Sequence, residues 1–496
     1  MKRVVTGKEM KMIDSYTIQN IGIPSLVLME RAAWSMVQRM LEVIDTSEGV
    51  LAVCGAGNNG GDAIAIARIL YGMGYSTGIY MAGDPEKWTN ETKIQIQIAR
   101  NVGVPEYNEL DLSSVQVVVD GLFGIGLQSF VREPFVKIIH RINHWRNNKT
   151  GAYVWAVDIP SGVSSDTGQI LGTAVKADYT VTFGYVKCGM ILYPGRDYSG
   201  KIYVEDIGFP KNVLEKCPVR GFSIENKDLL WMPERKNDSN KGDYGKILII
   251  AGSKNMSGAA YFAAKAAYTM GAGLVRVLTE ETNRVILQTQ LPQAMISVWE
   301  EMTNEQLKDI IGWADSVVIG PGVGTREEMK NRIEQVLSMI QCPLLLDADG
   351  LNLLAKENLW YDKLSKHTVI TPHMAEMSRL TGKCISDLKI DRSKSALEYA
   401  KERDFICVLK DSSTVISDGS RICFNRTGNH GMATGGSGDV LSGVIGALLG
   451  MGMDAFFAAC LGVYIHGAAG DVAAEIYGKR SMTSIELIEG LINILK

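Results

Sequence analysis

A glycine-dense segment near the carboxyl end of the sequence, residues 428–443, contains the carboxylate of Asp439 and runs directly into a strongly apolar stretch. Glycines let backbone N–H groups approach phosphate oxygens, and the first turn of a following helix presents its positive end to the same anion. A flexible turn is the alternative, but flexible linkers are not continuous with an apolar helix. We therefore predict a phosphoryl-transfer site in which Asp439 takes a proton from an attacking hydroxyl.

Length and charge narrow the class of protein. A chain of 496 residues exceeds what one hydrophobic core usually supports, so we expect two domains. The 51 basic and 55 acidic residues give a net charge of −4, which argues against nucleic-acid or membrane-surface partners and favours small-molecule substrates. The apolar residues 440–465 are interrupted by Asp454, so we predict two packed core helices there and not a membrane span.

The cysteines and the amino terminus indicate a cytoplasmic protein. The eight cysteines are scattered and contain no C-x-x-C pair, so neither a zinc site nor a disulfide framework is predicted. The first residues are basic, but no apolar stretch of signal-peptide length follows them. We expect a reducing cytosol and a homo-oligomer.

The first half of the sequence has the pattern of a doubly wound α/β domain. A short apolar strand at 50–54 precedes a glycine loop and a helix at 62–71, and further strands are predicted at 115–119, 153–157 and 179–183. Residues 7–40 are predicted to be helical, with one apolar face that packs against the sheet or a partner subunit.

The second half is predicted to be another α/β domain. Prolines and a polar run between residues 210 and 243 mark a linker. We predict domains at 1–215 and 241–496 around a linker at 216–240. Strands of the second domain are predicted at 246–251, 316–319, 344–346, 369–370 and 406–409.

Polar side chains follow several strands of the first domain. The loop 55–62 satisfies G-x-G-x-x-G through Gly55, Gly57 and Gly60, which alone is weak evidence. Asn58, Asn59 and Asp62 add amide and carboxylate groups that indicate a bound cation or polar ligand. Asp120 follows a second strand, and Asp158 and Ser161 follow a third. A single aspartate could be a turn cap, but carboxyl ends of parallel strands converge, so we expect Asn59, Asp120, Asp158 and Ser161 to share one pocket.

These motifs resemble the NAD(P)H-hydrate epimerase family: G-x-G-N-N-G-G-D at 55–62, V-D-I-P-S-G at 157–162, and A-D-x-T-V-T-F at 177–183 with Lys187. Ala63 and Ile125 depart from the family pattern without removing a polar ligand. The resemblance implies a K⁺ ion held by Asn59, Asp120 and Ser161, and Asp158 as the acid and base with Lys187 as its helper. It also implies that the hydrated nucleotide contacts Asp158 and the residues Asn58, Asn59, Gly60, Gly61, Asp62, Gly124, Ile125, Gly126, Leu127, Gln128, Ser129 and Phe130.

Strand ends of the second domain also carry polar or glycine-rich loops, at 320–324, 347–352, 371–376 and 410–414. His373 follows Thr-Pro at a predicted strand end, so we interpret it as a ligand contact. His140 and His144 lack the glutamate of H-E-x-x-H, and we predict that they lie on an exposed helix face without chemistry.

The second domain resembles the ribokinase-like superfamily and, within it, the ADP- or ATP-dependent NAD(P)H-hydrate dehydratases, through these loops and the motifs at 258–260, 271–275 and 466–471. The resemblance implies that Ala259, Gly322, His373 and the base Asp439 face the hydrate and that Mg²⁺ accompanies the nucleotide. It implies a nucleotide site formed by Lys410, Asp411, Ser412, Ser413, Thr414, Asn429, His430, Gly431, Met432, Ala433, Thr434, Gly435, Gly436, Ser437 and Gly438.

With both signatures in this order, the whole chain resembles the bifunctional NAD(P)H-hydrate repair enzymes of many bacteria. That implies an isomerase that interconverts the R and S hydrates of NADH and NADPH, fused to a lyase that dehydrates the S form by phosphorylating its C6 hydroxyl and eliminating phosphate. Two alternatives stay open: a ribokinase-like vitamin or sugar kinase, and a non-catalytic nucleotide-binding protein. The sequence leaves open ADP against ATP, hydrated NADH against hydrated NADPH, and transfer of substrate between sites.

Overall fold

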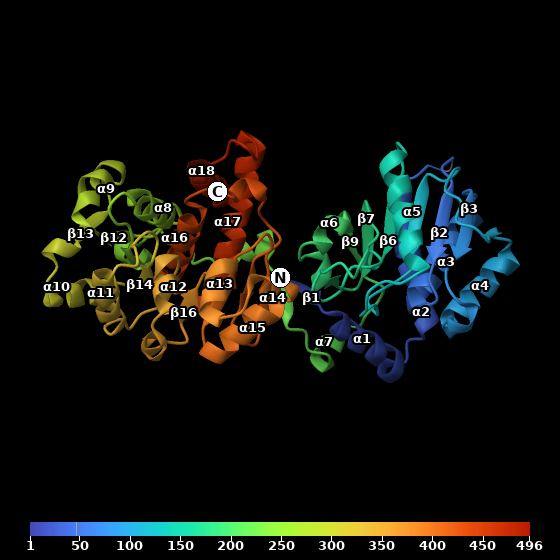
Figure 1. Ribbon diagram of the computed structural model, residues 1–496, viewed down its shortest axis with the longest axis horizontal. Helices are drawn as coiled ribbons and strands as arrows, with labels where there is room; N and C mark the ends of the chain where they lie inside the picture. Colours follow the sequence, from blue (N-terminus) through green and yellow to red (C-terminus); the bar gives the residue numbers. More distant parts are fainter. Residues whose placement is uncertain (46) are drawn as a thin grey trace. The chain divides into compact units, whose positions relative to one another are not determined.

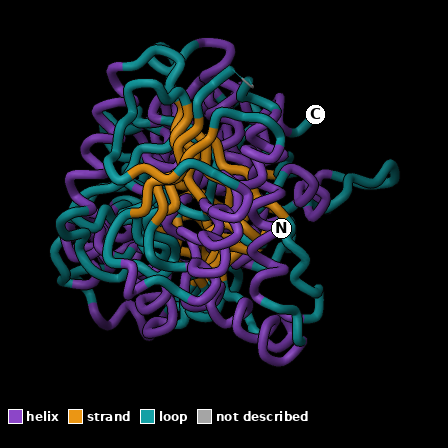
Figure 2. The backbone as a smooth tube through the Cα atoms, turned by 90° about the vertical axis from the view of Figure 1, so that its right-hand side faces the viewer, coloured by secondary structure: helices purple, strands orange, loops and turns teal. Residues whose placement is uncertain are grey.

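The computed structural model describes residues 1–45 and 47–496, which form two compact units. One unit comprises residues 3–221, and the other comprises residues 1–2 and 222–496. In both units helices and loops surround the strands, which confirms the predicted α/β class (Figures 1 and 2). The domain limits 1–215 and 241–496 stay a prediction. Among the residues of the predicted linker, the structure has β10 (Gly221–Ser223) and the short helix η4 (Asn226–Trp231).

The first unit contains a seven-stranded parallel sheet. Its strands follow the order β4-β3-β2-β5-β6-β7-β9. The strand order begins with β2 near the middle, proceeds through β3 to β4 at one edge, and continues with β5 on the other side of β2. A crevice therefore opens at the carboxyl ends of β2 and β5. The strand limits are β2 Val50–Cys54, β3 Thr77–Met81, β4 Glu106–Tyr107, β5 Val117–Gly121, β6 Tyr153–Val157, β7 Tyr179–Phe183 and β9 Lys201–Glu205.

Helices cover both faces of this sheet, because successive residues of a strand point to opposite faces. Val50, Ala52 and Cys54 of β2 belong to one buried cluster, with residues of α2 (Ser25–Leu41), α3 (Asn58–Gly72) and α4 (Asn90–Val102). Leu51 and Val53 belong to another, with α5 (Phe135–Asn148). The apolar face predicted within residues 7–40 therefore packs, through α2, on the sheet of its own chain.

The prediction that residues 7–40 are helical throughout is wrong at one point. Helix α1 (Gly7–Tyr16) continues as one π-helical turn, η1 (Thr17–Ile21), and ends before α2 begins. Gly22 has a φ of 89° there and Pro24 has no N–H to donate, so the helical hydrogen bonding stops. Before α1, strand β1 (Lys2–Val5) pairs in parallel with β8 (Val186–Lys187), with Val5 opposite Lys187.

Two other element limits differ from prediction at the ligand crevice. Strand β5 ends two residues later than the strand predicted at 115–119. Asp120 therefore belongs to β5 and does not follow it. Helix α3 begins at Asn58 and not at 62, because the N–H groups of Gly60 and Gly61 both bond to the carbonyl of Gly57. Strands β3, β4 and β9 of this unit were not predicted.

The second unit contains a larger mixed sheet. Its strands follow the order β13-β12-β11-β14-β15-β16-β17-β18-β19, parallel except for β17 with β18 and β18 with β19. Their limits are β11 Lys246–Ile250, β12 Leu274–Thr279, β13 Met295–Val298, β14 Ser316–Ile319, β15 Leu344–Leu346, β16 Thr368–Ile370, β17 Ile406–Leu409, β18 Val415–Ser417 and β19 Ile422–Phe424. The five predicted strands are present, and β12, β13, β18 and β19 were missed.

Helices again form two groups beside the strands (Figure 1). One group shares a buried cluster with the sheet: α8 (Ser257–Thr269), α16 (Ser437–Gly450), α17 (Ala455–Tyr477) and α18 (Ser484–Ile494). The other consists of α10 Asn304–Trp313, α11 Glu327–Leu337, α12 Asp349–Leu354, α13 Met374–Thr381, α14 Ile385–Ile390 and α15 Arg392–Arg403. Helix α17 is long and apolar enough to cross a membrane, but 78% of its most apolar stretch is buried. Residues 440–465 thus form two core helices, as predicted.

Candidate active sites

The first unit has a cavity of about 390 Å³ at the predicted strand ends. Its walls come from α1, α2, the start of α3, the loop after β5 and the end of β6. Of the predicted hydrate contacts, eight line it: Asn58, Asn59, Asp62, Gly124, Ile125, Gly126, Leu127 and Asp158. Lys187 lines it as well.

Asp158 and Lys187 form an ion pair at one side of this cavity. Asp158 has a φ of 65°, a strained backbone conformation for a residue with a side chain. Its Oδ1 accepts hydrogen bonds from Nζ of Lys187, from Oγ1 of Thr182 at 3.0 Å and from the Phe183 N–H at 3.1 Å. Lys187 is buried, and its remaining protons go to Oγ1 of Thr182 and to the carbonyl of Phe183. The pair is therefore held in place by β7.

Two further carboxyl groups line the same cavity, those of Asp14 on α1 and Asp62 on α3. Burial, partly offset by Lys187, raises the pKa of Asp14 to about 7. Burial and the nearby Asp158 and Asp14 raise the pKa of Asp62 well above its usual value. Near neutral pH the cavity thus contains both ion-paired and proton-bearing carboxyl groups.

A buried polar cluster lies behind the cavity wall. Both oxygens of Asp120 accept from Ser161, Oδ1 from the hydroxyl at 2.6 Å and Oδ2 from the N–H at 2.8 Å. The Ser161 hydroxyl also accepts from the Phe123 N–H at 2.8 Å. Burial raises the pKa of Asp120 to about 6 despite these bonds. Asn59 lines the cavity itself, and its side-chain amide nitrogen is buried without a partner among the described residues.

The remaining predicted contacts of the first unit lie outside the cavity lining. Gly60 and Gly61 are buried in the first turns of α3, where a β-carbon on Gly60 would lie 1.9 Å from the Gly55 carbonyl oxygen. Glycine is required there for close packing of the helix on the preceding loop. Gln128, Ser129 and Phe130 are exposed beyond the lined part of their loop. His140 and His144 are exposed on α5, as predicted.

The predicted base of the second unit lies in the first turn of α16. Gly436 caps this helix with a φ of 90°, and Asp439 is its third residue. Burial, together with the nearby Asp347 and Asp349, raises the pKa of Asp439 to about 7, although the Lys410 ammonium lowers it. Asp439 is therefore poised to exchange a proton near neutral pH.

A buried ion pair supports this helix start. Nζ of Lys410 lies 2.7 Å from Oδ1 of Asp347, and Oγ of Ser442 donates to Oδ2 of Asp347 at 2.7 Å. Burial alone would raise the pKa of Asp347, but Lys410 and these hydrogen bonds hold it below its usual value. A β-carbon on Gly438 would lie 3.6 Å from Nζ of Lys410, so the ammonium faces the glycine loop.

The predicted hydrate contacts of this unit come from three elements. Ala259 on α8 meets the loop after β14, where a β-carbon on Gly322 would lie 2.9 Å from that of Ala259. His373 caps α13: its Nδ1 accepts from the Ala375 N–H at 3.0 Å, so the proton resides on Nε2. Burial and the nearby Lys410 lower the pKa of His373, which keeps the imidazole neutral.

The predicted nucleotide residues form two loops. Residues 410–414 connect β17 and β18; Asp411 accepts from Nε of Arg392 at 2.6 Å, Ser413 is buried, and Ser412 is exposed. Residues 429–438 lead into α16, and Asn429 ties their start to α17 by donating to Gly470 and Asp471 at 2.9 Å. His430, Ala433 and Gly435 are exposed, and Gly431 is buried.

Two functional candidates were missed from the sequence, Asp14 and Asp347. Asp14 was predicted only as part of a packing helix, although a carboxylate between the apolar residues Met10 and Ile18 at helical spacing is a usable signal. Asp347 was noted in a strand-end loop without a role. Its partner Lys410 lies 63 residues away, so the pair is visible only in the folded chain.

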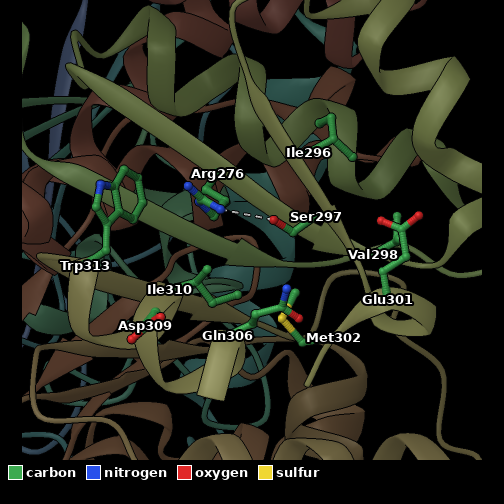
Figure 3. A pocket seen from close by; sticks show the side chains of 10 residues that line it. All are labelled: Arg276, Ile296, Ser297, Val298, Glu301, Met302, Gln306, Asp309, Ile310 and Trp313. Carbon is green, nitrogen blue, oxygen red and sulfur yellow. Dashed lines mark hydrogen bonds between the residues drawn. The ribbon is translucent and has the colours of Figure 1, made fainter. Parts of the chain in front are cut away.

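The second unit has a cavity of about 450 Å³ at the edge strand β13, beside β12 and α10 (Figure 3). Arg276 donates to Ser297 at 3.2 Å and lies over the Trp313 ring. The carboxylates of Glu301 and Asp309 line the same cavity, so it has no net positive charge that would select an anion. None of the predicted site residues line it.

Comparison with known proteins covers both units. A family model described as YjeF-related protein N-terminus matches residues 25–189, and one described as NAD(P)H-hydrate dehydratase matches residues 247–493. A bifunctional NAD(P)H-hydrate repair enzyme from Thermofilum pendens is 36% identical, over 100% of this chain and 96% of its own.

Two solved structures resemble the second unit. A ribokinase-like superfamily protein from Enterococcus faecalis V583 is 27% identical with a TM-score of 0.50, covering 55% of this chain and 94% of its own. The ADP/ATP-dependent NAD(P)H-hydrate dehydratase from Bacillus subtilis, co-crystallised with ATP/Mg²⁺, is 30% identical with a TM-score of 0.49, covering 55% of this chain and 96% of its own. The two family models agree with both resemblances drawn from the motifs.

Proposed function

The chain belongs to the family of bifunctional NAD(P)H-hydrate repair enzymes, and on that premise we propose which residues carry each half of the repair. The protein is an epimerase of hydrated NADH and NADPH and an ADP- or ATP-dependent dehydratase that returns the hydrate to the reduced cofactor. In our proposal the cavity at Asp158 serves epimerisation, and the helix start at Asp439 serves dehydration.

The observation that carries the dehydratase assignment is Asp439, a partly buried carboxylate in the first turn of α16 with a pKa raised by burial to about 7. Asp439 takes the proton of the C6 hydroxyl of the S hydrate, and the hydroxyl oxygen attacks the terminal phosphoryl group of the donor. The phosphorylated oxygen is then a good leaving group. The lone pair of the ring nitrogen expels phosphate, and loss of a ring proton restores the dihydronicotinamide.

The donor is ADP or ATP, bound between the loops 410–414 and 429–438. Residues 435–438 lead into the first turn of α16, and the positive end of this helix stabilises phosphates. The Lys410 ammonium faces the same loop and adds a positive charge beside the transferred group. Ala259, Gly322 and His373 form the hydrate side in this proposal.

Magnesium fits this site as a companion of the donor. No cluster of three or more His, Cys, Asp or Glu side chains suited to a metal ion occurs in residues 1–45 and 47–496. Mg²⁺ is commonly held through nucleotide phosphates and water with few protein ligands, so this donor set agrees with nucleotide-borne Mg²⁺. When bound, Mg²⁺ neutralises charge that develops on the phosphates.

The epimerase half uses the cavity at Asp158. The hydrate carries its hydroxyl on C6 beside the ring nitrogen, so loss and return of that hydroxyl inverts the carbon. Oδ1 of Asp158 is engaged by three donors, and Oδ2 has no hydrogen bond among the described residues. Asp158 therefore acts as the base toward water through Oδ2, and Lys187 orients its carboxylate.

A potassium ion suits the polar cluster behind this cavity. The buried carboxylate of Asp120, the hydroxyl of Ser161 and the amide of Asn59 are hard oxygen donors. The unpartnered amide nitrogen of Asn59 supports this assignment, because rotating the amide by half a turn replaces a buried orphan donor with an oxygen that a cation would bind. K⁺ would balance the charge of Asp120 and fix the loop after β5.

We also propose a cytoplasmic homo-oligomer. All eight cysteines are free, which supports a reducing compartment. Sedimentation of the purified protein measures its subunit number, and a monomer at micromolar concentration would contradict the second part.

Purified protein incubated with mixed hydrate epimers tests the function. With ADP or ATP and Mg²⁺, we expect near-ultraviolet absorbance of the reduced cofactor to return for both epimers, with one phosphate released per cofactor. Nucleotides are supplied in turn to identify the donor. A stable phosphorylated product without recovered cofactor would instead support the alternative of a small-molecule kinase.

A further inference from the structure

The Asp158–Lys187 pair has no proton to give to a leaving hydroxyl. Nζ of Lys187 donates to Oδ1 of Asp158 and, at 2.7 Å, to Oγ1 of Thr182. Its third proton goes to the Phe183 carbonyl at 3.2 Å, so the three N–H bonds of the ammonium are all directed at protein oxygens. Oδ1 of Asp158 receives three donors, so this carboxylate is placed to accept a proton through Oδ2. The departure of the C6 hydroxyl as water therefore needs a separate acid.

Asp14 reaches the same cavity from a different wall. The parallel pairing of Val5 with Lys187 fixes where α1 begins, and Met10 and Asp14, four apart on α1, turn the same helix face to the cavity. The Asp14 carboxyl has no hydrogen bond or ion pair with any residue of 1–45 and 47–496. A partly buried carboxyl that forms no ion pair of its own favours the protonated form and can donate its proton.

We propose that Asp14 is the general acid of the epimerisation, donating the proton that lets the C6 hydroxyl leave while Asp158 receives the proton of the returning water. This inference rests on the proposed epimerase function of the cavity. It assigns Asp14 a catalytic role that neither the glycine loop nor the strand-end motifs indicate.

The step balances without any further reactant. The Asp14 proton passes to the hydroxyl oxygen, the C6–O bond breaks with its electron pair on the departing water, and the ring nitrogen lone pair forms a C=N bond to C6. Water then adds to C6, the C=N electrons return to nitrogen, and the excess proton of water passes to Asp158. Solvent returns that proton to Asp14. An acid and a base on different walls serve the two faces of the ring, as inversion requires.

The charged groups that face Asp14 set its pH dependence. Lys187 from β8 lowers its pKa and Asp158 at the end of β6 raises it, while Asp62 on α3 and Lys11 on α1 line the same cavity. The acid must be protonated to act, so epimerisation should fall as pH rises through about 7. Burial and the nearby Asp158 and Asp14 also raise the pKa of Asp62 well above its usual value, so Asp62 is the competing candidate for the acid.

The test uses the full-length Asp14→Asn protein, single epimers of hydrated NADH, and water labelled with ¹⁸O. We expect Asp14→Asn to lower the rate constant of epimerisation and ¹⁸O incorporation at C6 together, by about 10²- to 10⁴-fold, with little change in KM. The alkaline fall near pH 7 should disappear. In Asp14→Ala, added formate should restore part of both rates, which a purely structural role of Asp14 would not allow.

Two controls separate the possible failures. Ser15→Ala changes the next, exposed residue of α1 and should keep wild-type rates. Wild-type protein that does not epimerise would overturn the proposed function itself. If the wild type is active and Asp14→Asn keeps more than half of its epimerisation rate, only this inference is overturned. Failure of formate to rescue Asp14→Ala would overturn it as well. If Asp62 variants lost epimerisation and were rescued by formate while Asp14 variants kept the wild-type rate, the acid role would belong to Asp62.

Discussion

Lys410 and Asp347 are joined by a contact of 2.7 Å between Nζ and Oδ1, although 63 residues separate them in the chain. Asp347 has a side chain only 2% exposed and also accepts from Ser442 of α16. The pair therefore couples the ends of β15 and β17 to the helix that carries Asp439.

Removing the ammonium should destabilise the second unit. Lys410→Met leaves the Asp347 carboxylate buried without its partner, and we expect the local free energy of unfolding to fall by about 3 kcal/mol. Hydrogen exchange of peptides from β15 and α16 measures the change. The exposed Lys366→Met is the matched control. The double variant Lys410→Met, Asp347→Leu should recover part of the loss, and unchanged exchange in the single variant would contradict the prediction.

Asp439→Asn should separate the two activities. The amide keeps the size of the side chain but cannot accept the hydroxyl proton, so we expect dehydration to fall by about 10²- to 10⁴-fold while epimerisation stays at the wild-type rate. Cofactor absorbance reports dehydration, and chromatography of the epimers reports the other reaction. Asp309→Asn, an exposed aspartate of the same unit, serves as the control. Loss of both activities would count against two separate sites.

The pH dependence of dehydration should report the ionisation of Asp439. The base must be deprotonated, and burial raises its pKa to about 7, so kcat/KM should be low in acid and rise through about pH 7. The Asp349 carboxylate contributes to that raised pKa. Asp349→Asn should therefore move the rise to lower pH. A rise near pH 4 in the wild type would rule out a base with this pKa.

Potassium should support epimerisation through Asn59. When KCl is replaced stepwise by choline chloride at constant ionic strength, the wild-type epimerisation rate should fall, because the loop after β5 loses its ion. Asn59→Leu removes one oxygen donor, and we expect a 10- to 100-fold higher K⁺ requirement, by analogy with the loss of other metal-site groups. Asn108→Leu, at an exposed position, should behave as the wild type. A wild-type rate independent of K⁺ would exclude the ion.

Sequence patterns predicted most of the sheet positions but not all element limits. Strands such as β6 and β14 consist mostly of β-branched, aromatic and other apolar residues and were found at the correct residues. Strand β12 was missed, because Arg276 interrupts its apolar run on the face turned to α10. The start of α3 was placed four residues late because its first residues are asparagines and glycines, which have poor helix propensity.

The sequence by itself determined the α/β class and the family, and it predicted the residues Asp158 and Asp439, because these depend on local motifs and on strand ends that converge in any parallel sheet. Only the tertiary structure decided which groups carry protons. Whether Asp14 is neutral, Asp158 ion-paired or Asp439 ionised near neutral pH depends on burial and on partners distant in the chain, such as Lys187 and Lys410. Desolvation and electrostatic interaction depend on distances in space, which the order of residues does not contain.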